Sequence, residues 1–355
     1  MVDHRVERRK LHSMSSIIFI TVSAVISGCE TWNEVELFGT TQLDWIERYV
    51  DIPNGIPSHD TFNRFFSYMD PEPFEQAFRK WVASFTEELD DSVVSLDGKS
   101  IRGCKTGPTS ALHIVSAWSA AAGITLGQVK TPDKGGELSA VLELLDSLFL
   151  EGAVVTLDAL STHPHIVSKI RERKAHYMIQ VKRNRMLLFN DIENAFVYHT
   201  PDRHTTEQSA HGRTEIRRIA VIPADKVVMT GNTEWKDLSA IIRVTRWVKD
   251  NLTGEEHNNV AYYISSVPNI TAMRAAEIIR AHWAIENNLH WMLDVVFSED
   301  ADRKRNHNAV VNFSLIRKIS MVGLSKVSYK NIGMKSRRKA AMMDMNYREQ
   351  VINQL

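Results

Sequence analysis

Two aspartates follow predicted strands at positions that favour a meeting of their carboxylates. Asp97 ends a short β-rich run that begins at Val93, and Asp158 ends the apolar run that begins at Ala153. Binding groups converge at strand ends in α/β sheets, so neighbouring strands would bring these two side chains together. Such a pair repels unless a cation neutralises it, and Mg²⁺ prefers oxygen ligands. The pair therefore predicts a divalent-cation site, although either Asp alone would also suit a turn cap.

Glu286 is the third candidate, on a long helix predicted from Thr271 to about Leu293. His282 and His290 flank it at four residues on either side, so the three side chains lie along one side of the helix, next to an apolar stripe. A carboxylate at the edge of a buried face is costly unless it is paired or binds metal. The alternatives are an ion pair across the helix interface and a zinc site made by these three residues. The zinc site ranks low, because i to i+8 spans two turns and no HExxH motif is present.

The elements that would position these residues fall into two regions. Residues 11–90 carry apolar and aromatic side chains at helical spacing, which predicts three or four helices. From residue 91 the pattern reads strand, strand, strand, helix, strand, helix, strand, and predicts a mixed sheet with covered faces. Strand-like alternation over about 200–266 interrupts this unit, and two helices follow. The predicted fold class is α/β, with a mixed sheet, a β-rich insertion and a small all-α domain in front.

Composition fits a globular protein with two compact units. The chain has 355 residues, of which 43% are hydrophobic and 24% charged, so it can bury a real core. Cys29 and Cys104 are the only cysteines and are too distant for a CxxC pair. This usage excludes a disulfide framework and a zinc site built from cysteines, and it favours a cytoplasmic location.

The net charge of zero hides an asymmetry. Residues 1–90 contain 8 Lys and Arg against 15 Asp and Glu, whereas residues 303–355 contain 12 against 2. A basic segment is typical of proteins that contact nucleic acid or an anionic membrane surface, although a solvated helix face has the same composition.

The uncharged stretch from Met14 to Cys29 resembles a signal peptide, because basic residues precede it and it ends like a lipoprotein cleavage site. Its strongly apolar part is too short to span a bilayer. Helical spacing also continues directly after Cys29, without the linker that an anchored protein needs. We therefore expect a buried core helix and no membrane partner.

Five segments carry a family resemblance: LDGKSIRG, TLDAL, the Lys182 to Asn184 stretch, HGRTEIR, and RAHWAIENNLHWMLDVVFSEDADR. They resemble the motifs of bacterial insertion-sequence transposases of the DDE superfamily. The sequence is most similar to the H-repeat-associated proteins found beside Rhs elements, and the similarity extends to NGIPSHDTF near the N-terminus and to the basic C-terminal segment.

This resemblance implies a ribonuclease H-like core in which Asp97, Asp158 and Glu286 bind two Mg²⁺ ions, with Mn²⁺ able to replace Mg²⁺. The implied activity is metal-dependent DNA strand cleavage and strand transfer at the ends of an insertion sequence. The implied partners are double-stranded DNA of the element ends and the target, and further copies of the chain in a homo-oligomer. The implied domains are a helical domain at 1–90, a catalytic domain at 91–330 and a basic tail at 331–355.

Related transposases carry Tyr and Arg before the catalytic Glu and a Lys after it. Here the position four before Glu286 is His282 and the position seven after it is Leu293. A hairpin-forming mechanism is therefore not predicted. Two further alternatives to a transposase remain, a nuclease on the same core that cuts without joining, and an inactive relic that binds DNA without turnover.

The matched motifs also imply phosphate contacts, although each residue would equally suit a solvated surface. These residues are Lys99, Arg102, Lys182, Asn184, Arg213 and Arg217, with Arg303, Lys304 and Arg305 as a grip on DNA that enters the site. Trp283 and Trp291 would either stack on a flipped base or pack in the core.

Overall fold

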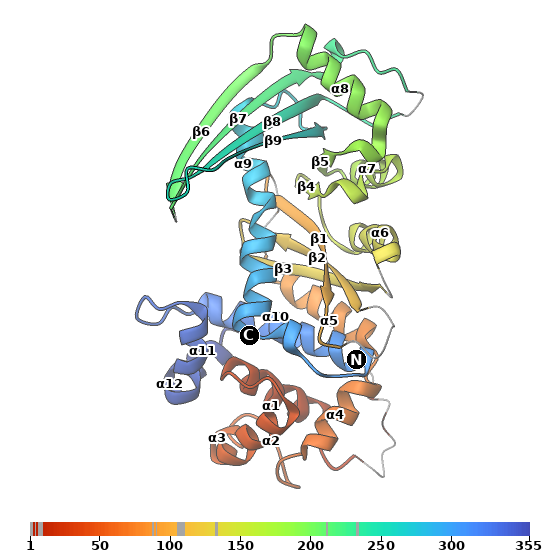
Figure 1. Cartoon of the computed structure of the whole chain (residues 1–355). Helices are drawn as coiled ribbons and strands as arrows, with labels where there is room; N and C mark the ends of the chain where they lie inside the picture. The colour runs from red at the N-terminus through yellow and green to blue at the C-terminus, as the bar shows by residue number, and fades with distance from the viewer. Residues whose placement is uncertain are drawn as a thin grey trace.

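The structure is a computed structural model. It describes residues 3, 5, 10–86, 89, 91–104, 111–131, 134–210, 212–231 and 234–355. Helices from both ends of the chain gather at one end of the molecule, a single sheet runs through the middle, and four long strands form the other end (Figure 1).

Five helices make up the N-terminal part. Polar residues fix two of the helix starts, because the Ser13 hydroxyl accepts a hydrogen bond from the Ser16 N–H, and Thr31 and Glu34 form a reciprocal capping box. Aromatic rings fill the space between helices, and those of Trp32 and Phe66 stack with centroids 5.1 Å apart. The helices are α1 (Met14–Ile26), α2 (Trp32–Thr41), α3 (Leu43–Ile46), α4 (His59–Tyr68) and α5 (Pro71–Ala83).

The stretch that resembles a signal peptide forms α1, and most of its side chains are buried. Cys29, just beyond α1, is also buried, and burial raises the pKa of its thiol to about 12. The expected core helix is confirmed. In the described part of the chain, no helix has the length and apolar character needed to cross a bilayer.

Nine strands form one mixed sheet in the order β3-β2-β1-β4-β5-β9-β8-β7-β6. β4 runs parallel to both β1 and β5, and the other neighbouring pairs are antiparallel. The strands are β1 (Val93–Ile101), β2 (Leu112–Ser119), β3 (Ile124–Thr131), β4 (Val154–Leu157), β5 (His176–Val181), β6 (Asp202–Ala210), β7 (Arg213–Pro223), β8 (Ala240–Asp250) and β9 (Glu256–Ser265). The predicted mixed sheet is confirmed, and the strand-rich region continues the same sheet through β5 and β9.

Helices cover both faces of the central strands. α9 (Ala272–His282) lies on one face, and α6 (Glu137–Ser147), α7 (Pro164–Glu172) and α8 (Met186–Tyr198) lie on the other (Figure 1). All four residues of β4 are buried, as expected for a strand covered on both sides. The sequence did not predict α8.

The long helix predicted from Thr271 to about Leu293 is wrong in its second half. α9 ends at His282, and the chain then forms π-helical segments at Ile285–His290 and Met292–Val296. Their backbone bonds run from i to i+5, so side chains four apart no longer share one line on the helix surface. The predicted alignment of three side chains is lost as a result.

The basic C-terminal segment forms three helices that pack with the N-terminal helices: α10 (His307–Lys326), α11 (Met334–Met343) and α12 (Met345–Ile352). Several of its basic residues are buried rather than solvated. Arg338 donates to the Val25 carbonyl oxygen at 2.9 Å and pairs with Glu30 at 2.6 Å. Arg348 donates to Gln42 Oε1 at 2.6 Å. A large part of the basic excess is therefore used inside the protein.

Candidate active site

Asp97 and Asp158 lie beside each other at the edge of the central sheet. The parallel register pairs Val93 with Val154 and Ser95 with Thr156, and two further steps set Asp97 next to Asp158. Asp97 is not at a strand end as predicted, because β1 continues along β2 as far as Ile101. Asp97 lies instead beside the point where β4 ends. Of the two strands, only β4 therefore ends at the edge where the carboxylates were expected.

Glu286 reaches the same edge from the first π-helical segment. His282, four residues earlier, lies over the sheet, with its Nδ1 2.9 Å from the Thr156 hydroxyl on β4. Burial lowers the pKa of His282 to about 4, so the ring is neutral at pH 7. Thr156 also donates to the hydroxyl of Ser95 at 3.1 Å. These contacts fix α9 on β1 and β4, while the Glu286 side chain faces solvent.

The acidic residues act on one another electrostatically. The pKa of Asp97 is raised to about 7, first by burial and then by the negative charges of Asp158, Glu137 and Glu286, although the Gly98 N–H donates to Asp97 at 2.9 Å and opposes the shift. We call Asp97, Glu137, Asp158 and Glu286 the acidic edge. Four elements that are distant in sequence supply it, and like charges dominate the surroundings of Asp97.

His290 completes the surroundings of Asp97. Its Nδ1 lies 3.4 Å from Asp97 Oδ2. Burial lowers the pKa of His290 to about 4, and the nearby ammonium groups of Lys99 and Lys318 act in the same direction. A neutral imidazole therefore orients the Asp97 carboxylate without cancelling its charge.

A preformed metal cage is absent from the described ranges, since no three His, Cys, Asp or Glu side chains there converge on one point. This argues against the zinc site from His282, Glu286 and His290, and His282 is bonded to Thr156 instead. Mg²⁺ does not need such a cage, because one or two carboxylates, waters and substrate phosphates usually hold it. The oxygen-only donors of the acidic edge and the raised pKa of Asp97 fit a divalent cation of this kind.

Lys99 is held inside the protein. Its ammonium pairs with Asp294 and lies 2.6 Å from Glu299 Oε2. Burial alone would raise the pKa of Glu299, but Lys99, Arg317 and Lys318 outweigh it and hold that pKa at about 2. Lys99 therefore ties β1 to the chain that follows the π-helical segments, which keeps Glu286 near the sheet.

The other predicted DNA contacts are distributed over two regions. Asn184 lies near Asp158, because its Nδ2 donates to the Ala159 carbonyl oxygen at 2.8 Å. Arg305 donates to the Gly103 carbonyl oxygen at 3.4 Å, beyond the end of β1. The exposed side chains near Asn184 and Arg305 are those of Arg102, Lys182 and Arg303. Arg213 is exposed at the start of β7. Lys304 is largely buried against Asp302.

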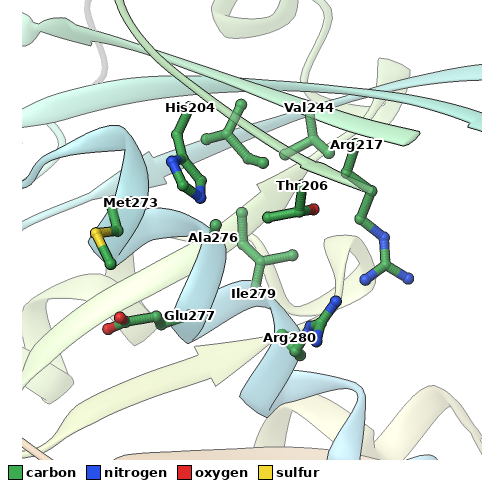
Figure 2. Close-up of a pocket in the computed structure, with 10 residues that line it drawn as sticks. His204, Thr206, Arg217, Val244, Met273, Ala276, Glu277, Ile279 and Arg280 are labelled. Atoms are coloured by element: carbon green, nitrogen blue, oxygen red, sulfur yellow. The ribbon is translucent and has the colours of Figure 1, made fainter. Parts of the chain in front are cut away.

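Arg217 borders a pocket of about 170 Å³ between α9 and strands β6 to β8. Figure 2 shows its guanidinium group on the same side of the pocket as that of Arg280. The pKa of Arg217 is lowered, first by burial and also by the positive charges of Arg246 and Arg280, although Glu215 opposes the shift. Arg280 precedes Glu286 by six residues, and we call Arg217 and Arg280 the basic rim beside α9.

Sequence reasoning missed Glu137 and Arg280, and it placed His290 only in a low-ranked zinc site. The sequence did contain a signal for Glu137, because this residue begins the helix that follows the third strand. In a three-strand meander the third strand ends at the same sheet edge as the first, so that helix begins near the edge of Asp97. Trp283 and Trp291 are 48% and 53% exposed, so neither packs fully in the core.

The chain is similar to known transposases along nearly its whole length. Residues 1–82 match the family model described as DDE_Tnp_1-associated, and residues 88–322 match the one described as Transposase DDE domain. "Putative transposase YncI" of Escherichia coli O157:H7 is 37% identical over 99% of this chain and 92% of its own length. "H repeat-associated putative transposase YhhI" of Escherichia coli K12 is 35% identical over 99% and 95%.

Among solved structures, the cryo-EM structure of a piggyBac transposase synaptic complex with hairpin DNA is 11% identical, with a TM-score of 0.43 over 98% of this chain and 76% of that one. The match of the Transposase DDE domain over most of the chain, together with relatives above 30% identity along nearly its full length, decides the assignment. This chain belongs to the family of transposases with a DDE domain.

Proposed function

We propose that this DNA transposase cleaves and rejoins DNA strands at the ends of its own insertion sequence, with Asp97, Asp158 and Glu286 as its catalytic carboxylates. The observation that carries the proposal is the electrostatic state of Asp97. Burial and three neighbouring carboxylates raise the pKa of Asp97 to about 7. Without a bound cation, the site therefore disfavours the negative charge of Asp97. Perturbed pKa values of this kind cluster where a protein binds a cation or carries out chemistry.

A ribonuclease H-like core is part of this proposal. The part of the sheet that supports it has the order β3-β2-β1-β4-β5, with an antiparallel meander followed by two parallel strands. In this arrangement Asp97 and Asp158 come from neighbouring parallel strands, and Glu286 comes from the helical segment that covers them. Strands β6 to β9 then form the insertion between the second and third carboxylates.

The acidic edge would hold Mg²⁺, or Mn²⁺ in its place, through Asp97, Asp158 and Glu286. Two such ions, when bound, supply Lewis-acid activation of the attacking oxygen and charge stabilisation at the leaving oxygen of an in-line phosphoryl transfer. The residues of this chain position the reaction. His290 orients Asp97, Thr156 and His282 fix α9 on the sheet, and Lys99 secures the chain after Glu286.

DNA contacts would surround this edge on two sides. Arg217 and Arg280 form a basic rim beside α9, and Arg102, Lys182, Asn184, Arg303 and Arg305 lie near the ends of β1 and β5. Lys99 would have to release Asp294 and Glu299 before it contacted a phosphate, so we assign it the internal role. We further propose that copies of the chain assemble on paired element ends in the cytoplasm.

The decisive experiment incubates the full chain with a supercoiled donor plasmid that carries the element ends, in Mg²⁺ or in EDTA. We expect excision and joined products in Mg²⁺, with a plasmid of scrambled ends as the matched control. Cleavage without joining would indicate a nuclease. A gel shift without cleavage in Mg²⁺ would indicate an inactive relic, and both outcomes would contradict the proposal.

A further inference from the structure

Glu137 is the member of the acidic edge that the three-carboxylate site does not use. It begins α6, shortly after β3 ends, and β3 runs parallel to β1 because both are antiparallel to β2. The start of α6 is thereby brought to the edge that carries Asp97. The Glu137 side chain is only 14% exposed, and within the described residues its one recorded ion pair is with His113 Nε2 at 3.8 Å.

Gly98 shows how closely Glu137 approaches the backbone beside Asp97. A Cβ atom at position 98 would lie 2.5 Å from Glu137 Oε1 and 2.2 Å from His113 Nε2, closer than real Cβ atoms come. A larger residue at position 98 would therefore displace the Glu137 carboxylate or the His113 ring. Asp97 and Gly98 point to opposite faces of β1. β4 ends at Leu157, so it does not extend beside Gly98 to separate the two faces at this edge.

His113 provides an independent sign that a ligand belongs at this point. Its side chain is 2% exposed, and its Nδ1 lies 3.0 Å from the Ser100 hydroxyl. Its Nε2 is buried without a hydrogen-bond partner among the described residues, although it faces Glu137 and Gly98. A buried polar atom in this state is costly and calls for an explanation. A shift of Glu137 Oε1 from 3.8 Å to hydrogen-bond distance would give that nitrogen its partner.

The charges around Asp97 also support a place for Glu137 in the site. Glu137 contributes more than Glu286 to the raised pKa of Asp97, after burial and Asp158. Two divalent cations carry four positive charges, whereas Asp97, Asp158 and Glu286 carry three negative ones. A fourth carboxylate balances the pair before the phosphate of the substrate arrives.

We propose that Glu137 is a fourth carboxylate ligand of this site, where it completes the oxygen shell of the divalent cation held by Asp97, with His113 as its orienting partner. This rests on the proposed function and adds to it a residue beyond the three that the sequence motifs mark. The consequence is that cation binding, and not only catalysis, depends on α6.

The test measures Mn²⁺ binding to the full chain by isothermal titration calorimetry without DNA. The variants are Glu137→Gln, Glu137→Asp, Asp97→Asn and the control Glu143→Gln, an exposed glutamate on the same helix. We expect Glu137→Gln to weaken Mn²⁺ binding by about 10-fold to 100-fold, as for the loss of groups around a metal site. Glu143→Gln should bind as the wild type does, and Glu137→Asp, which keeps the charge, should recover part of the affinity.

The outcomes separate this inference from the proposed function. Wild-type Mn²⁺ affinity in a folded Glu137→Gln variant, together with weakened binding in Asp97→Asn, would overturn the inference and leave the three-carboxylate site intact. Unchanged binding in both variants would overturn both. A thermal melt in EDTA checks folding, and equal losses in Glu137→Gln and Glu137→Asp would mean that Glu137 only supports the structure.

Discussion

The chain concentrates charge in two regions, and they are built in opposite ways. In the acidic edge, burial and neighbouring carboxylates both disfavour the charge of Asp97. The second region, which we call the cationic core, consists of Lys304, Arg317, Lys318, Arg338 and Arg348. There opposite charges and carbonyl oxygens lie next to the cations. Arg317 Nη1, for example, lies 3.0 Å from Asp302 Oδ2.

The difference shows what each region does. A buried charge that has its counter-charge inside the protein fixes one arrangement of the chain, and removal of either partner is costly. A cluster of like charges costs stability until an outside ion joins it. The cationic core therefore holds the N-terminal and C-terminal helices together, whereas the acidic edge lacks a counter-charge until a cation binds.

The largest effect is expected from neutral substitutions in the acidic edge. Asp97→Asn, Asp158→Asn and Glu286→Gln should each reduce DNA cleavage by about 1,000-fold or more, because catalytic carboxylates act as a unit. DNA affinity should hardly change, since phosphate contacts lie elsewhere. Glu172→Gln on α7 is the exposed control. Normal cleavage by Glu286→Gln would remove Glu286 from the site, and Glu299 would not replace it because Lys99 holds it in a buried ion pair.

The next effect concerns the cationic core. Arg338→Ala should lower the free energy of unfolding by about 3–5 kcal/mol, because it removes a buried guanidinium and leaves the partly buried Glu30 without its closest cation. Urea unfolding followed by circular dichroism measures this change. Lys335→Ala, on the exposed side of the same helix, should stay within about 0.5 kcal/mol of the wild type. Equal effects of the two variants would mean that the buried ion pairs do not hold the helices together.

Asp97→Asn should also separate stability from activity. The pKa of Asp97 in the folded protein is about 7, against an ordinary value of 3.8, so the folded state binds the proton more tightly than the unfolded state. Its contribution to stability is present below pH 4 and is lost as the pH rises through 7. The asparagine side chain does not ionise, so the variant does not lose stability in this way as the pH rises. In EDTA the variant should therefore gain a few degrees in Tm relative to the wild type between pH 5 and pH 8, and Mg²⁺ should raise the Tm of the wild type only.

A pH-independent Tm difference in EDTA would show that Asp97 is not under repulsion. Equal stabilisation of both proteins by Mg²⁺ would show that the ion binds elsewhere.

The smallest effect is expected at the basic rim beside α9. Arg217→Gln and Arg280→Gln should each weaken DNA binding several-fold and reduce the slope of log K against log salt by about 1, as expected for a lost phosphate contact. Arg173→Gln, at the residue just after α7 that pairs with Asp146, is the control. Fluorescence anisotropy over a salt series measures both quantities, and an unchanged slope would place the DNA path away from the pocket of Figure 2.

The sequence predicted the strands and helices from residue 93 to 181 well, because their apolar periodicity is set by burial on one or both faces. It failed where tertiary packing overrides local pattern. The π-helical winding around Glu286 leaves no mark in composition, and α8 was missed altogether. Charge counts alone predict a basic C-terminal segment that contacts nucleic acid or stays solvated. They do not show that Arg338 reaches Val25, Glu30 and Val296 across the chain.

The candidate site was predictable in part for the same reason. Asp97 and Asp158 follow from strand order, since the register of two parallel strands sets them side by side. Glu286 was a candidate because the predicted helix placed it at the edge of an apolar stripe, and the motif resemblance then implied its role, although the helix itself is wrong in its second half. Strand order could have placed the start of α6 near Asp97, but the approach of Glu137 and His113 to Gly98 depends on how α6 packs on β2 and β3, which the sequence does not show.

Arg338 bonds to carbonyl oxygens of Val25 and Val296 and to the carboxylate of Glu30, and so joins the start of the chain to the end of the π-helical segments. A nascent chain on the ribosome cannot make these bonds until residue 338 has left the exit tunnel. We therefore expect the segment that carries Glu286 to settle only after residue 338 has emerged. Gene copies interrupted upstream of this codon would then yield proteins whose sheet can form while their third carboxylate lacks its support.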